Sequence, residues 1–157
     1  IVRVSGESMR ETLQDQDMLV VLNNWLCGTY EQGDIVILQR DDFYGGEPIV
    51  KRVIATEGQT VDIDFDAGVV YVDGTALEEP YTREPTWTQE GTEFPLTVPE
   101  GCIFVMGDNR NDSDDSRDSA LGPVDTRCVL GRALLLAVPG PTADTDQRDW
   151  SRVGILN

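Results

Sequence analysis

The chain of 157 residues contains no long stretch with the periodicity of an amphipathic helix, and this absence constrains its fold more than any other feature. No window of about twelve or more residues places apolar side chains at every third or fourth position. Short runs of β-branched and aromatic residues alternate with turn residues instead, and such runs predict strands. The runs lie at residues 18–22, 34–38, 49–54, 61–65, 69–72, 94–98, 102–106 and 133–138. We expect a mainly β fold, either a barrel or a pair of packed antiparallel sheets with few short helices.

The length of the chain favours one domain with a single core, so we expect residues 1–157 to fold as one unit. Asp73-Gly74 follows the run at 69–72 and predicts a tight hairpin turn, because this dipeptide accepts the positive φ angles of such turns. Residues 77–92 contain two prolines, four glutamates and a tryptophan without any period of apolar residues. We expect this segment to be a loop-rich insertion.

The charge of the chain argues against several classes of function. Its formal net charge is −17, whereas a nucleic-acid-binding protein needs a basic face that neutralises phosphates. The same charge opposes electrostatic docking on anionic lipid. The longest apolar run, at 133–138, is far shorter than the roughly 20 residues of a membrane-spanning helix. We therefore expect no nucleic-acid partner and no membrane span within this chain.

The composition also limits the chemistry of any site. Histidine is absent, so the chain contains no Ser-His triad and no histidine metal cluster. The three cysteines, Cys27, Cys102 and Cys128, have no Cys-x-x-Cys spacing. Their odd number gives no disulfide framework, so the sequence leaves the redox compartment open.

Lys51 is the only lysine in the chain, beside eleven arginines. Because arginine stays protonated in proteins, Lys51 is the one side chain that can supply a nitrogen base. In a strand, Lys51 shares a face with Ile49, Val53 and Ala55, and an apolar face lowers the pKa of an amine. This matters because an ordinary lysine is neutral only about once in a few thousand molecules at pH 7. The alternative interpretation is a charged residue that protects an edge strand from aggregation.

Ser8 lies in the segment Gly6-Glu7-Ser8-Met9-Arg10-Glu11. A nucleophilic serine needs an exposed hydroxyl on a tight turn and nearby backbone N–H groups that bind the oxyanion. Gly6 permits the unusual backbone angles of such a turn. The alternative interpretation is a helix cap, in which Glu11, three residues after Ser8, completes a capping box.

A third segment, residues 101–124, begins as a strand and continues as a loop rich in Asp, Asn, Ser and Arg. Four of its aspartates invite a calcium interpretation: Asp108, Asp112, Asp114 and Asp115. The segment lacks the glycine and the closing glutamate of an EF-hand loop, however, and its arginines would oppose a cation. We therefore expect a loop braced by Asp–Arg pairs, with no metal ion and no cofactor.

Taken together, these segments resemble the type I signal peptidase family. The resemblance rests on Ser8-Met9 with Thr12-Leu13, on Gly33-Asp34-Ile35-Val36, on Lys51-Arg52-Val53-Ile54, and on Gly107-Asp108-Asn109-Arg110 followed by Ser113, Asp115, Ser116, Arg117, Gly122 and Val124. The blocks occur in the order and spacing of the family and cover roughly residues 2–138. The resemblance implies a signal-peptidase-like β fold and a single catalytic domain.

The resemblance also implies roles for individual residues. Ser8 would be the nucleophile and Lys51 the general base, and the backbone N–H of Ser8 would contribute to the oxyanion hole. Ser113 would support the lysine amine through a hydrogen bond. Asp115 and Arg117 would form a structural ion pair near the site.

The implied activity is that of a serine endopeptidase that removes N-terminal signal peptides from secretory preproteins after small residues, with Met9 in contact with the substrate. We expect a membrane anchor upstream of this chain in the full-length protein, which would place the domain on the outer face of the cytoplasmic membrane. The chain departs from the family pattern at Glu11, Glu57 and Gln59. It also has Gly6 where some members carry a second hydroxyl for the oxyanion, so a second oxyanion donor is not identified.

Two other functions stay open at this point. A non-catalytic relative would serve as an assembly or chaperone factor for secreted or pilus proteins. Such a relative would be expected to lose Ser8 or Lys51, and both are present. A self-cleaving repressor would also use a Ser-Lys pair, but the acidic charge and the long loop at 108–117 disfavour it.

Overall fold

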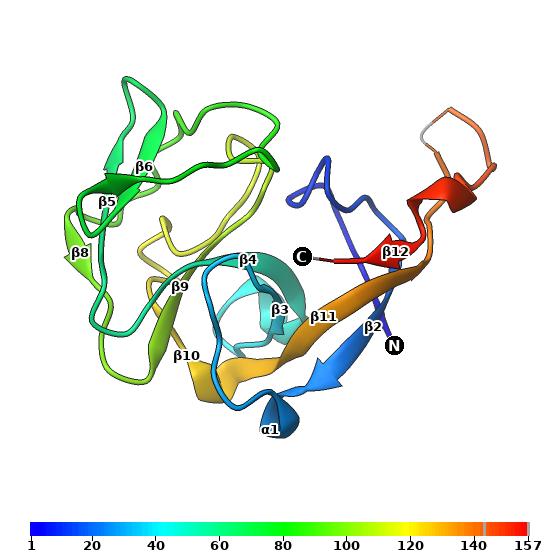
Figure 1. Ribbon diagram of the computed structural model, residues 1–157, viewed down its shortest axis with the longest axis horizontal. Helices are drawn as coiled ribbons and strands as arrows, with labels where there is room; N and C mark the ends of the chain where they lie inside the picture. The colour runs from blue at the N-terminus through cyan, green and yellow to red at the C-terminus, as the bar shows by residue number, and fades with distance from the viewer. Residues whose placement is uncertain (143, 157) are drawn as a thin grey trace.

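The computed structural model describes residues 1–142 and 144–156 and consists mostly of antiparallel strands in two sheets (Figure 1). In the larger sheet the order is β1-β2-β11-β3-β4-β9-β10, and β12 also pairs with β11. Its strands are β1 (Val2–Arg3), β2 (Met18–Asn23), β3 (Ile35–Leu38), β4 (Ile49–Thr56), β9 (Cys102–Met106), β10 (Val124–Asp125), β11 (Val129–Val138) and β12 (Gly154–Ile155). The expectation of a mainly β fold is confirmed.

The smaller sheet has the order β7-β6-β5-β8 and lies beside the larger one, at the left of Figure 1. Its strands are β5 (Thr60–Asp64), β6 (Val69–Val72), β7 (Thr75–Ala76) and β8 (Leu96–Thr97). Helical structure in the described residues is limited to α1 (Asn24–Cys27) and single 3₁₀ turns at Tyr44–Gly46, Thr126–Cys128 and Trp150–Arg152. The larger sheet curls into a half-barrel (Figure 1).

The predicted strands match the observed ones closely at most positions. Asp73 and Gly74 have φ angles of 50° and 79°, as the predicted tight turn between β6 and β7 requires. The run at 94–98 is shorter than predicted, because only β8 pairs there and the Phe94 ring packs against Phe65 and Phe104 instead. The run at 133–138 is longer than predicted, because β11 already begins at Val129, four residues before the apolar run.

Three apolar clusters form the core, and two of them bear on the site. One joins the two sheets: Ile54, Ala55, Phe104 and Met106 of β4 and β9 pack against Val61, Ile63, Val70 and Val72 of the smaller sheet. A second lies beneath the segment after β1 and contains Val4, Met9, Leu13, Ile35, Ile37 and Val50. Burial of such side chains supplies most of the driving force for folding. The second cluster therefore fixes the segment around Ser8 against β3 and β4.

Residues 77–92 contain neither a helix nor a strand. The segment is fastened to the loop at 107–123 by backbone hydrogen bonds, among them Thr92 N–H to the Arg117 carbonyl at 2.9 Å. The amide oxygen of Asn111 also accepts a hydrogen bond from the backbone N–H of Trp87 at 3.0 Å. Within the described chain, no helix has the length and apolar character needed to cross a bilayer.

Asp17 joins the beginning of the chain to its end. Its carboxylate is fully buried and accepts hydrogen bonds from the backbone N–H groups of Gln14 at 2.9 Å and Gly140 at 2.7 Å. The Arg152 guanidinium donates two more, at 2.9 and 2.7 Å. A buried carboxylate is tolerated only when its oxygens are paired in this way.

We expect Asp17→Asn to lower the free energy of unfolding by about 3 kcal/mol, because the amide leaves the Arg152 guanidinium without its charged partner. Urea titration followed by circular dichroism measures the change. The control is Asp125→Asn, which breaks an ion pair whose arginine, Arg127, is 89% exposed. That change is expected to cost less than about 1 kcal/mol. Equal losses in the two variants would contradict this role of Asp17.

Candidate active site

Ser8 lies in a turn that follows β1, and the next helix in the chain begins only at Asn24. The helix-cap interpretation of Ser8 is therefore wrong. The Ser8 carbonyl accepts a hydrogen bond from the Asn109 N–H at 2.9 Å, and the Asn109 side-chain amide donates to the Glu7 carbonyl at 3.1 Å. Two bonds from one asparagine thus fix the turn to the loop that follows β9.

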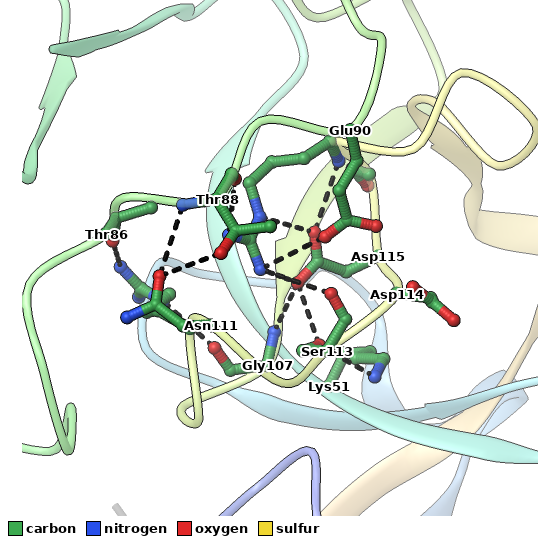
Figure 2. Close-up of polar contacts among 12 residues, drawn as sticks. Lys51, Thr86, Thr88, Glu90, Gly107, Asn111, Ser113, Asp114 and Asp115 are labelled. Carbon is green, nitrogen blue, oxygen red and sulfur yellow. Dashed lines mark hydrogen bonds and ion pairs between the residues drawn. The ribbon is translucent and has the colours of Figure 1, made fainter. Parts of the chain in front are cut away.

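Lys51 lies in β4, between β3 and β9 in the middle of the larger sheet. It pairs with Val36 of β3, and only 3% of its surface is exposed. The interpretation of Lys51 as a guard of an edge strand is therefore wrong. The Lys51 amine donates a hydrogen bond to the Ser113 hydroxyl at 3.0 Å (Figure 2).

Burial is the largest influence on the Lys51 amine, and it lowers the pKa below the ordinary value of 10.5. The carboxylates of Asp115 and Asp114 act in the opposite direction, and the Arg117 guanidinium acts with burial. The net pKa is lowered because desolvation outweighs these charges. A larger share of the molecules therefore carries a neutral amine near neutral pH than for an exposed lysine.

Ser113, Asp115 and Arg117 form a continuous hydrogen-bonded chain behind the amine, of which Figure 2 labels Ser113 and Asp115. The Ser113 hydroxyl donates to Asp115 Oδ2 at 2.9 Å, and so does the Gly107 N–H at 2.9 Å. Arg117 donates to both carboxylate oxygens, at 2.9 and 2.8 Å. Burial by itself raises the pKa of Asp115, but the bonds from Arg117 outweigh it and hold that pKa below its usual value. The ionised carboxylate thus accepts the hydrogen bond of the Ser113 hydroxyl, which leaves the Ser113 oxygen free to accept a hydrogen bond from Lys51.

A cavity of about 410 Å³ brings Ser8, Lys51 and Ser113 together. Its other lining residues are Val4, Ser5, Gly6, Glu7, Tyr44, Glu47, Pro48, Ile49, Val50, Asp112 and Asp114. Among the described residues, neither the hydroxyl nor the backbone N–H of Ser8 has a hydrogen-bond partner. Met9 is 1% exposed and packs in the core beneath the turn, outside the lining of this cavity. Its contact with a substrate stays a prediction.

Gly107 is a site residue whose role the sequence did not reveal. A Cβ atom there would lie 2.5 Å from the Ser8 carbonyl oxygen and closer still to the Ser113 hydroxyl. Glycine is therefore the one residue type that lets the turn at Ser8 and the loop at Ser113 approach each other so closely. Its φ angle is not positive, so no turn signal in the sequence marks it.

Arg52, Asp108 and Thr12 form a second buried network that the sequence did not reveal. Arg52 follows Lys51 on β4 and makes two hydrogen bonds to Asp108, at 2.8 and 2.7 Å. Asp108 also accepts from the Thr12 hydroxyl at 2.6 Å, and the Arg52 guanidinium lies 3.8 Å from the centre of the Tyr81 ring. This network fixes the end of the Ser8 turn to the strand that carries Lys51.

The expectation of a loop braced by Asp–Arg pairs holds for Asp115 with Arg117, whereas Arg110 pairs with Glu79 from the segment at 77–92. The carboxylate oxygens of Glu90, Asp114 and Asp118 lie within 4.8 Å of one another. The Arg117 guanidinium lies 3.6 Å from the Glu90 carboxyl and already supplies positive charge there. We therefore assign no metal ion to this group.

Comparisons with known proteins place this geometry in a family. The sequence model described as "Signal peptidase, peptidase S26" matches residues 1–138. The chain is 38% identical over 144 residues to a signal peptidase I of Bacillus licheniformis, covering 87% of this chain and 75% of the relative. It is 36% identical over 143 residues to a probable signal peptidase I-1 of Synechocystis sp., covering 87% of this chain and 69% of the relative.

A solved structure agrees with the sequence comparisons. The crystal structure of a signal peptidase I from Enterococcus faecalis V583 matches with a TM-score of 0.54 at 32% identity, covering 66% of this chain and 96% of that one. The chain therefore belongs to the signal peptidase family, peptidase S26, whose members are serine endopeptidases. The resemblance found in the sequence is confirmed, while the roles of individual residues stay predictions.

Gly107→Ala tests whether the close approach of the two loops matters. We expect it to lower the free energy of unfolding by about 1–3 kcal/mol, because the methyl group overlaps the Ser8 carbonyl and the Ser113 hydroxyl. If Ser8 and Lys51 have the roles that the resemblance implies, peptide-bond cleavage should fall by roughly 100-fold, since the Ser8 turn is pushed away from Ser113 and the amine bound to it. Denaturant titration and a cleavage assay measure the two effects.

The matched control is Gly154→Ala, at a position where a Cβ meets nothing within 4 Å. This variant should retain the stability and the activity of the unmodified chain. If Gly107→Ala behaves like this control, the glycine is not needed for the approach of the loops.

Proposed function

We propose that this chain is the catalytic domain of a type I signal peptidase that removes N-terminal signal peptides from exported preproteins through a Ser8–Lys51 pair. The observation that carries the proposal is the burial of the chain's one lysine in the wall of the cavity that also contains Ser8. A buried amine with a lowered pKa can accept a proton at neutral pH, which an exposed lysine does rarely. Family membership supports the same activity.

The proposed reaction has two halves that use the same pair. The neutral Lys51 amine takes the proton from the Ser8 hydroxyl while the serine oxygen attacks the scissile carbonyl carbon. The free N–H of Ser8 donates to the oxyanion that develops. Lys51 then gives its proton to the leaving amine, which leaves an acyl-enzyme. In the second half Lys51 activates a water molecule that hydrolyses the ester and releases the signal peptide.

Ser113 and Asp115 would keep the amine in place during both halves. The hydrogen bond from Lys51 to Ser113 restricts rotation of the lysine side chain without adding a charge beside it. Asp115, held by Arg117, orients the Ser113 hydroxyl so that its oxygen faces the amine. Orientation of this kind contributes to the rate because it fixes the reacting groups before the chemical step.

The substrate would bind as an extended peptide along the cavity. The segment from Val4 to Ser8 forms one wall, and the residues from Glu47 to Lys51 form the other. Because β9 pairs with β4 only from Arg52 onward, residues 49–51 pair with β3 alone, and an extended peptide can form main-chain hydrogen bonds to their other side. The apolar part of the lining, with Val4, Ile49 and Val50, would accept small side chains before the cleaved bond and exclude large ones.

We further propose that residues 1–157 act as one catalytic domain in which 77–92 is an insertion, and that the full-length protein is anchored in the cytoplasmic membrane by a segment upstream of this chain. The domain would then work on the outer face, where exported preproteins emerge. Family membership supports membrane association. The complete reading frame tests this proposal, since a hydrophilic upstream segment would contradict it.

Ser8→Ala and Lys51→Ala should each abolish cleavage of a preprotein with alanine one and three positions before the cut. We expect losses of at least about 100-fold for Lys51→Ala and more for Ser8→Ala, because the first removes the general base and the second the nucleophile. Mass spectrometry of the products measures both rate and cleavage position.

The control is Ser5→Ala, which removes an exposed hydroxyl from the lining of the same cavity. It should cleave at the rate of the unmodified chain and at the same bond. Full activity of Ser8→Ala would refute the mechanism, and equal losses in all three variants would point to damage of the turn instead.

The lowered pKa of Lys51 also predicts how stability depends on pH. Between the folded pKa and the ordinary value of 10.5, the unfolded chain binds a proton that the folded chain does not, so stability rises with pH in that window. We therefore expect Lys51→Met to unfold at higher urea concentration than the unmodified chain at pH 7, with an advantage that shrinks as the pH approaches 10.5.

The control is Arg3→Met, which removes an exposed arginine that stays charged throughout this range. Its effect on stability should be the same at pH 7 and at pH 10. A Lys51→Met advantage that does not change with pH would show that the amine titrates normally.

A further inference from the structure

Glu90 lies in the segment at 77–92, next to the Asp115–Arg117 pair. Hydrogen bonds before and after it in the sequence hold it there. Arg117 donates to the Thr88 carbonyl at 3.1 Å, and the Thr92 N–H donates to the Arg117 carbonyl at 2.9 Å. The Glu90 side chain between these contacts is 13% exposed and points toward Asp115 (Figure 2). The position of Glu90 is therefore fixed by hydrogen bonds to the backbone of Thr88 and Thr92, and neither bond involves the Glu90 carboxyl group.

The Glu90 carboxyl group is poorly compensated. Its Oε1 atom is buried and has no hydrogen-bond partner among the described residues. The closest positive group is the Arg117 guanidinium at 3.6 Å, which is already engaged by Asp115 at 2.8 Å. An ionised carboxylate in this position would lack the hydrogen bonds that normally accompany burial.

Several charged and titratable groups surround Glu90. The loop at 107–123 contributes Asp114, Asp115, Arg117 and Asp118, the 3₁₀ turn at 44–46 contributes Tyr44, and β4 contributes Lys51. Burial first, and then the neighbouring carboxyl groups of Asp115 and Asp114, raise the pKa of Glu90 to about 8, while Arg117 lowers it. The raised pKa favours the protonated form of Glu90 near neutral pH.

We propose that Glu90 is a positioning residue that acts on the Lys51 amine through Arg117, Asp115 and Ser113, and that loss of its proton makes the amine harder to deprotonate. The path is continuous: Glu90 lies beside Arg117, Arg117 binds Asp115, Asp115 binds Ser113, and Ser113 accepts from Lys51. The catalytic consequence rests on the proposed role of Lys51 as the general base.

The sign of the effect follows from charge. A protonated Glu90 is neutral and leaves the Lys51 pKa at its lowered value, whereas an ionised Glu90 raises the Lys51 pKa. As the pH passes about 8, Glu90 becomes negative and favours the charged form of the Lys51 amine over the neutral form. The titration of Lys51 should therefore be broad in the unmodified chain. It should follow a simple single-proton curve when residue 90 is permanently neutral.

The unique lysine makes a direct test possible, because a chain labelled with [ε-¹⁵N]lysine gives one side-chain resonance. We expect Glu90→Gln to shift the midpoint of the Lys51 titration to lower pH by on the order of one pH unit and to sharpen the curve. Glutamine is nearly isosteric with protonated glutamate, so the fold should be retained. The matched control is Glu93→Gln, at an exposed position just after the segment at 77–92.

The outcomes separate the two proposals. If the Lys51 titration in Glu90→Gln has the same midpoint and shape as in the unmodified chain and in Glu93→Gln, the role of Glu90 is overturned. This holds whatever the cleavage assay shows. If the shift is found but Ser8→Ala still cleaves preproteins, the catalytic pair is wrong and the coupling stands.

The pH profile of kcat/KM supplies a second readout. The ratio of Glu90→Gln to the unmodified chain should be near one below pH 7 and rise several-fold between pH 8 and 10. An equal loss of activity at every pH would mean that Glu90 has a structural role only.

Discussion

The burial of one amine in the middle of a sheet is the constraint on which the arrangement of the site depends. A charged amine at 3% exposure would be costly unless a carboxylate touched it, and such a contact would raise its pKa. The chain avoids both outcomes by placing the Ser113 hydroxyl between Lys51 and Asp115. Arg117 then offsets much of the negative charge of Asp115. The amine is fixed by a neutral partner, so burial lowers its pKa more than the separated carboxylate raises it.

The loop at 107–123 organises this arrangement because it contacts every other part of the site. Asn109 holds the Ser8 turn, Asp108 holds Arg52 of the strand that carries Lys51, and Arg110 holds Glu79 of the segment at 77–92. From the same loop, Ser113 accepts a hydrogen bond from the amine, and Asp115 accepts one from Ser113. Much of the density of Asp, Asn, Ser and Arg in this loop thus reflects buried hydrogen-bonding partners: Asp108, Asn109, Arg110, Ser113, Asp115 and Arg117.

Local patterns predicted the strands well, since the alternation at 61–65 and the Asp73-Gly74 turn depend only on neighbouring residues. The environment of Lys51, in contrast, depends on residues that are distant in the sequence. Residues 49–54 alone are compatible with either an edge strand or a central strand. The strand is central because β9, about fifty residues further along the chain, pairs with β4. Glu90 was missed for the same reason, because its partner Arg117 lies in another segment. Gly107 stood in a recognised motif, but its role depends on the distant Ser8 turn and leaves no local signal.

The segment at 77–92 has the composition of a surface loop, yet it carries part of the electrostatics of the site. Glu79 pairs with Arg110 and Glu90 lies against Arg117, so two of its carboxyl groups face the two buried arginines of the loop at 107–123. Both arginines are fully buried, and a buried guanidinium must be balanced by negative charge from somewhere. Asp115 supplies this charge for Arg117, and Glu79 of the segment supplies it for Arg110. The neutral form of Glu90 lies beside Arg117 without adding charge until it loses its proton. A change in the length of this segment would therefore alter the charge around Lys51 without touching any residue that lines the cavity.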